Sequence, residues 1–221
     1  MDYSIIVLKL KDLKLKNIAC KIENMEIFLY NFNFIWFNSF LALISVVFGW
    51  LMIKARKKFA KILYGFIWLI FLPNTIYILT DITHLFEDWP KVDNLLRAIL
   101  IIQYTLFSIV GIITFTIAVY FFQKLLDRKS KKKMKPSTFV SICILNFMVG
   151  FAVVLGGIQR TNSWHIFTDP IRVANDVLDV LSSKELLMLS LGIGVFANLV
   201  YFLMAETVVK WSKQFFKNGG P

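Results

Sequence analysis

Asp81 and His84 stand three residues apart at the end of an apolar stretch, 62–85, that reads ILYGFIWLIFLPNTIYILTDITHL. Residues at this spacing share one face of a helix. A carboxylate beside an imidazole can move a proton in acid–base catalysis or help to bind a metal ion. The alternative is a helix-end pair that only orients the following loop. Because the spacing of the histidines, His84 and His165, does not require a metal, we predict neither a metal nor a cofactor.

A second set of polar residues lies inside the apolar stretches, one amide in each of five: Asn38, Asn74, Gln103, Asn146 and Asn198. At about 1.5 Å of rise per residue, the first three lie roughly 7 to 11 Å below one end of their helices, so they fall in one layer. Tyr77 and Thr80 follow Asn74 on the same stretch. The layer either lines a polar cavity or consists of interhelical hydrogen bonds, which are worth about 0.6 to 2 kcal/mol each in membranes.

Arg160 is the candidate for binding an anion. It lies in the segment GGIQRTNSW, directly after an apolar stretch, and a guanidinium at a membrane interface binds phosphate or carboxylate groups. A pairing with Asp81 across two loops is the alternative. With its neighbours and the amide layer, Arg160 completes the predicted ligand-binding set: Asn38, Asn74, Tyr77, Thr80, Gln103, Arg160, Asn162, Ser163 and Trp164.

The composition predicts membrane-spanning helices, which would hold these residues in a bilayer. Of the 221 residues, 57% are hydrophobic and 16% aromatic, so the chain is an integral membrane protein. A basic amphipathic segment (1–31) precedes a helix bundle (32–211), and a short cytoplasmic tail (212–221) follows it. Short connections predict an all-α polytopic bundle, and five stretches are close to the roughly 20 residues that a bilayer requires: 33–53, 62–80, 96–122, 137–157 and 186–209.

The basic residues predict the orientation of the bundle. The formal net charge is +11, and Lys and Arg cluster in loops 54–61 and 123–136, which should be cytoplasmic. Loops 81–95 and 158–185 are richer in acidic residues and should face outward. Because the charges lie in short loops between apolar stretches, we exclude nucleic acid as a partner. We predict a cell-membrane protein with the lipid bilayer as a partner, and a homo-oligomer or a membrane-protein partner stays open.

Local signals predict a broken helix and a surface helix. Pro73 has no N–H for the Leu69 carbonyl, so the helix should kink there and free an acceptor near the Asn74 amide. Further along, Asp169 and Pro170 are typical of a helix start. The short amphipathic helix that follows either roofs the polar layer or rests on lipid headgroups, and its predicted apolar face is Ile171, Ala174, Val177, Leu178 and Leu181.

Small residues recur at four-residue spacing in the last apolar stretch: Ser190, Gly194 and Asn198. Such a stripe lets a second helix approach closely. Gly150 and Gly156 on the preceding stretch are suited to face it. The pattern predicts close packing of the last two spans and has no direct bearing on function.

The elements FIWFNSFLALI, FLPNTIYILTDITHL and GGIQRTNSW together resemble the domain-of-unknown-function 1361 family of bacterial multipass membrane proteins. The resemblance covers about residues 34 to 164 and implies no activity. The chain departs from the family pattern at Ile76, where a second proline is usual, and at His165, where an aspartate is usual. The shared positions that the resemblance implies are Asn38, Pro73, Asn74, Tyr77, Thr80, Asp81, His84, Arg160, Asn162, Ser163 and Trp164.

Two functions are compatible with these residues. The leading hypothesis is a cell-envelope protein, accessory or transport-related, whose outward polar pocket binds an anionic or lipid-headgroup ligand or docks a partner. The alternative is a membrane-embedded enzyme that acts on a lipid-linked substrate at the outer leaflet. In that enzyme, His84 and Asp81 would be the acid–base pair and Arg160 would hold the anion.

Overall fold

The computed structural model describes residues 3–80, 82–127, 134–161 and 165–218. These ranges are helical and contain no β-strand, which confirms the all-α class. The helices are α1 (Tyr3–Lys54), α2 (Lys58–Phe71), α3 (Pro73–Thr80), α4 (Thr83–Asp88), the 3-10 helix η1 (Trp89–Lys91), α5 (Asn94–Leu126), α6 (Pro136–Gly157), α7 (His165–Thr168), α8 (Pro170–Ser182) and α9 (Lys184–Asn218). As predicted, five segments are long and apolar enough to cross a membrane: Met25–Lys54, Lys58–Lys91, Asn94–Leu126, Pro136–Gly157 and Lys184–Val208.

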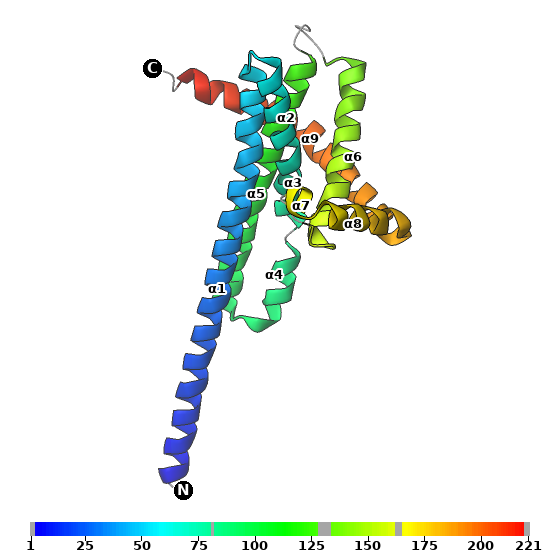
Figure 1. The fold of residues 1–221 in the computed structure, drawn as a ribbon. Coiled ribbons are helices and arrows are strands. Elements are labelled where there is room, and N and C mark those ends of the chain that lie inside the picture. Colours follow the sequence, from blue (N-terminus) through cyan, green and yellow to red (C-terminus); the bar gives the residue numbers. More distant parts are fainter. Residues whose placement is uncertain (1–2, 81, 128–133, 162–164, 219–221) are drawn as a thin grey trace.

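Figure 1 shows how the helices are arranged. α1, α2 with α3, α5 and α6 run roughly along one axis, α9 crosses this axis obliquely, and α8 lies nearly at right angles to it. The α1–α2 loop, the start of α6 and the end of α9 lie at one end of the bundle. α4, α7 and α8 lie toward the other end, which we call the α8 end, and α1 extends past it. α1 continues unbroken through residue 31, so the N-terminal segment and the first span form one helix.

Local signals set the helix starts at the α8 end. Asp93 caps α5 by accepting a hydrogen bond from the Leu96 N–H at 2.8 Å. Asp169 caps α8 in the same way, as predicted, by accepting from the Arg172 N–H at 3.1 Å. Pro170 occupies the first turn of α8, where no helical partner exists for an N–H. These caps fix where the polar connections leave the membrane helices.

α6 and α9 pack closely through small residues. A Cβ on Gly150 would stand 2.4 Å from the Ser190 carbonyl oxygen and 2.5 Å from the Gly194 nitrogen, so a larger residue does not fit. Near this contact, Asn146 Nδ2 donates a hydrogen bond to Asn198 Oδ1 at 3.0 Å. The predicted close packing of the last two spans is therefore confirmed at Gly150, and this amide pair joins the two helices without a ligand. Gly156, the other glycine expected at the contact, lies instead next to the Tyr77 ring, which a Cβ there would approach to 3.7 Å.

The second span breaks at Pro73, as predicted. α2 ends at Phe71 and α3 begins at Pro73. Asn74 Nδ2 donates to the Phe71 carbonyl oxygen at 3.2 Å, whereas the sequence pointed to the Leu69 carbonyl as the freed acceptor. A side chain thus satisfies a backbone group that lipid could not satisfy.

α8 is the predicted amphipathic surface helix, with a somewhat different apolar face. Val180, which the predicted face omits, is fully buried. Four of the five residues of that face are exposed, among them Ile171 at 74% and Leu178 at 60%, and only Val177 is partly buried. The helical period locates an apolar stripe, but the neighbouring helices decide which edge of it packs. The exposed edge is suited to the membrane interface.

Candidate functional site

A cavity of about 560 Å³ lies between α1, α2 and α3 on one side and α6, α7 and α8 on the other. Its volume is in the range of about 300 to 1,000 Å³ that is typical of small-molecule sites. The polar residues that line it are Asn38, Asn74, Tyr77, Arg160 and Thr161. Its apolar lining comes chiefly from Phe37, Leu41, Phe66, Leu69, Ile70, Phe71, Ala152, Val153, Leu155, Ile166 and Val173.

α1 and α3 contribute three of the polar side chains. Asn38 of α1 is buried, and Asn74 directly follows the helix break. The Asn74 side-chain amide donates to the Phe71 carbonyl oxygen. The Tyr77 ring packs on the end of α6, where a Cβ on Gly157 would stand 3.3 Å from it. The break and this ring contact together position the amide and the phenol at the cavity.

Arg160 lies in the turn after α6 and has a left-handed backbone conformation, with a φ of 57°. The Thr161 N–H closes this turn by donating to the Leu155 carbonyl oxygen at 3.0 Å. Among the described non-glycine residues, no other has a positive φ. The conformation costs an L-residue about 1 to 2 kcal/mol, and glycine is the usual residue at such a position. The arginine therefore stands here at a cost in stability.

α8 holds this turn through other side chains. Asp176 accepts a hydrogen bond from the Thr161 hydroxyl and pairs with Arg172 at 3.7 Å. Arg172 Nη2 also donates to the Arg160 carbonyl oxygen at 3.5 Å. No carboxylate in the described part of the chain forms a salt bridge with the Arg160 guanidinium. The turn is thus held by its own backbone hydrogen bond and by side chains of α8, and Arg160 is one of the residues that line the cavity.

Two of the other predicted site residues, Thr80 and Gln103, do not line this cavity. Thr80 does not line it, and the Thr80 hydroxyl donates to the Tyr77 carbonyl oxygen at 2.8 Å. Gln103 does not line it either, and its side-chain nitrogen and oxygen are buried without a partner among the described residues. The predicted layer therefore contributes Asn38 and Asn74 to the cavity. Four predicted residues fall outside the described ranges: Asp81, Asn162, Ser163 and Trp164.

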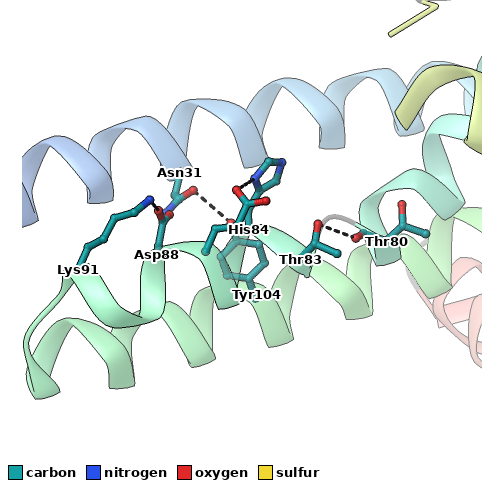
Figure 2. Close-up of polar contacts among 8 residues, drawn as sticks. Asn31, Thr80, Thr83, His84, Asp88, Lys91 and Tyr104 are labelled. Carbon is teal, nitrogen blue, oxygen red and sulfur yellow. Dashed lines mark hydrogen bonds and ion pairs between the residues drawn. The ribbon is translucent and has the colours of Figure 1, made fainter. Parts of the chain in front are cut away.

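His84 lies on α4 and is not part of the cavity lining. Its Nδ1 atom is 3.3 Å from Glu87 Oε2, a carboxylate on the same helix (Figure 2). The predicted partner, Asp81, lies outside the described residues. Within the described ranges, no three His, Cys, Asp or Glu side chains come together as a metal site would require.

Sequence patterns do not reveal a second polar cluster, which joins α1 to α4, η1 and α5. Asn31 is fully buried, donates to Asp88 Oδ2 at 3.0 Å and accepts from the Tyr104 hydroxyl at 3.1 Å. Lys91 Nζ donates to the other Asp88 oxygen at 3.0 Å. Figure 2 shows these residues meeting between the helices. We call this group the Asn31 cluster. The sequence signal for it is weak, because the apolar run FLYNFNF contains two amides, Asn31 and Asn33, and nothing in the run shows which one is buried.

The fold defines a multipass integral membrane protein, and a cavity with a mainly apolar lining lies between its helices. A family model described as "Protein of unknown function (DUF1361)" matches residues 37–200. The chain belongs to this family, which confirms the resemblance seen in the sequence and extends it into α9. Neither a curated protein nor a solved structure matches the chain.

Proposed function

We propose that the cavity binds an anionic ligand and that Arg160 recognises the negative charge. The ligand is a small anion or the headgroup of a lipid, since phosphate and carboxylate groups present the same oxygen atoms to a guanidinium. The chain would thereby serve the cell envelope as an accessory or transport-related protein. The observation that carries the proposal is an arginine that lines a membrane-protein cavity and forms no salt bridge with a carboxylate in the described part of the chain.

The backbone at Arg160 supports the same proposal. Its left-handed conformation disfavours an arginine, and glycine would remove the cost in stability. Strained residues of this kind concentrate at functional sites, where the side chain is worth the strain. A purely structural turn would gain nothing from a cation at this position, because α8 already holds the turn through Thr161 and Asp176.

Neutral groups at the cavity complement the cation. Asn38, Asn74 and Tyr77 are polar residues that line the same site, and small-molecule sites combine an apolar lining with a few polar groups. We place this site on the extracytoplasmic side of the cell membrane. The placement rests on the Lys- and Arg-rich loops 54–61 and 123–136, because such loops face the cytoplasm. These loops join the ends of the membrane helices that are away from the α8 end (Figure 1), so the α8 end should face outward.

The enzyme alternative has less support from the geometry. A catalytic imidazole has to reach a ligand in the cavity directly or through one water molecule. His84 is not among the residues that line the cavity, and its Nδ1 atom contacts Glu87. We therefore propose binding rather than catalysis.

Native mass spectrometry after gentle extraction tests the proposal. The unaltered protein is compared with Arg160→Gly, which removes the guanidinium while relieving the backbone. Arg56→Gly is the matched control, because Arg56 is an exposed arginine in the α1–α2 loop at the opposite end. We expect an anionic species to remain bound to the unaltered protein and to the control, and to be lost from Arg160→Gly. Equal retention by all three proteins, or no bound anion in any of them, would overturn the proposal.

A further inference from the structure

We infer that the ligand is an amphiphile, with a hydrocarbon chain that lies along the apolar part of the cavity and a phosphate or carboxylate group at Arg160. The inference rests on the proposed function and narrows its ligand class. The apolar part is formed by Phe66, Leu69 and Ile70 of α2 and by Ala152 of α6. None of these side chains can donate or accept a hydrogen bond.

A small hydrated anion does not match this cavity. It would occupy the part near Arg160 and leave most of the 560 Å³ to water. A buried water molecule needs about two to four polar partners, and apolar cavities stay dry. Phe66 and Asn74 lie about 12 Å apart along the helix direction, at roughly 1.5 Å per residue. The apolar part is therefore long enough to hold a run of methylene groups.

The side of the cavity that faces the bilayer gives such a chain a route. Phe37 of α1 and Phe66 of α2 line the cavity and are also 52% and 47% exposed. The Phe167 ring of α7 meets the Phe66 ring edge-on, with centroids 6.3 Å apart, and is 67% exposed. α3 packs on α6, whereas α1 and α2 do not pack extensively on it in the described part of the chain. These exposed rings give a lipid chain an apolar path from the bilayer to the cavity, beside the part of α6 on which α1 and α2 do not pack extensively.

Three probes distinguish the contribution of the ligand's hydrocarbon chain to binding from that of its anionic group. They are 1-oleoyl lysophosphatidate, glycerol 3-phosphate and 1-oleoylglycerol, each titrated against delipidated protein in micelles of an uncharged maltoside detergent, which carries no phosphate or carboxylate. Ala152→Trp fills the apolar part of the cavity. Ile144→Trp is its control, because Ile144 lies on the same helix, is exposed and does not line the cavity. Circular dichroism and thermal unfolding show whether each variant is folded.

We expect lysophosphatidate to bind about tenfold or more tightly than either fragment. Ala152→Trp should remove this advantage while still binding glycerol 3-phosphate, and Ile144→Trp should bind all three probes normally. If glycerol 3-phosphate competes as well as lysophosphatidate, or if Ala152→Trp binds lysophosphatidate normally, the inference fails while the proposed anion site stands. If Arg160→Gly binds lysophosphatidate normally, the proposed function itself fails. An Ala152→Trp variant that does not fold is replaced by Leu69→Trp, to which the same outcomes apply.

Discussion

The side-chain amide of Asn31 on α1 donates a hydrogen bond to Asp88 at the end of α4, over 3.0 Å and across 57 positions of the chain. Asn31 also accepts from the Tyr104 hydroxyl and is fully buried. Asn31→Ala leaves both partners without this amide, and an unsatisfied buried polar group costs about 1 to 3 kcal/mol. We expect the free energy of unfolding to fall by that amount. Hydrogen exchange at the α4 amides should become faster.

Asn33→Ala is the control for this prediction, because Asn33 is exposed on the same helix. It should leave the midpoint of thermal unfolding and the exchange rates of α4 unchanged. Equal effects of the two substitutions would mean that the Asn31 cluster does not hold α4 against α1.

Because α6 and α9 approach closely, we expect one added methyl group at their contact to lower the stability of the protein. Gly150→Ala places a Cβ within 2.4 Å of the Ser190 carbonyl oxygen, so the helices must move apart. Overpacking of this kind costs about 1 to 3 kcal/mol or more. Gly192→Ala on α9 is the matched control, because its Cβ would meet no atom within 4 Å. Thermal unfolding should show a lower midpoint for Gly150→Ala and an unchanged or higher one for Gly192→Ala, since alanine favours a helix.

The sequence was sufficient for features that depend on one segment at a time. Length and apolarity locate the spans, Pro73 locates the break, and Asp169 with Pro170 locates the start of α8. The stripe that includes Gly194 indicates a close helix contact, because small side chains on one face of a helix let a neighbouring helix approach. None of these features depends on how a helix is rotated about its own axis.

The cavity could not be predicted in full because its lining depends on helix rotation. Rise per residue gives the depth of a side chain, and it placed Gln103 level with Asn38 and Asn74. Packing decides which way each helix turns, and Gln103 is absent from the lining that contains the two asparagines. The role of Asn31 could not be predicted from the sequence for a related reason. Its partners, among them Asp88, are far away in the sequence and no local period connects them.

The amide pair between α6 and α9 predicts a measurable coupling. Asn146 Nδ2 donates to Asn198 Oδ1 at 3.0 Å, and Asn198 Nδ2 donates to the Gly194 carbonyl oxygen. A double-mutant cycle with Asn146→Ala and Asn198→Ala should give a coupling free energy of about 0.6 to 2 kcal/mol in the unfolding equilibrium. Strictly additive effects would show that the two amides do not stabilise the helix pair together.

The charge distribution predicts which end of the bundle faces the cytoplasm. Lys57 in the α1–α2 loop and Asn175 on α8 are both exposed. The loop lies at one end of the bundle and α8 lies toward the other (Figure 1). Single cysteines at these positions, in a chain whose Cys20 and Cys143 are replaced by serine, can be probed with a membrane-impermeant maleimide. In intact cells, Asn175→Cys should be labelled and Lys57→Cys only after permeabilisation. The reverse pattern would invert the proposed orientation and place the cavity on the cytoplasmic side.

Two substitutions at the left-handed turn distinguish the role of the Arg160 side chain from that of its backbone conformation. Arg160→Ala and Arg160→Gly remove the same guanidinium, so both should lose the anionic ligand. They differ in the backbone, because alanine retains the cost of a φ of 57° and glycine does not. Arg160→Gly should therefore be more stable than Arg160→Ala by about 1 to 2 kcal/mol, measured by unfolding of ligand-free protein. Equal stability of the two variants would contradict the left-handed conformation, and retention of the anion by either variant would contradict the role of the guanidinium.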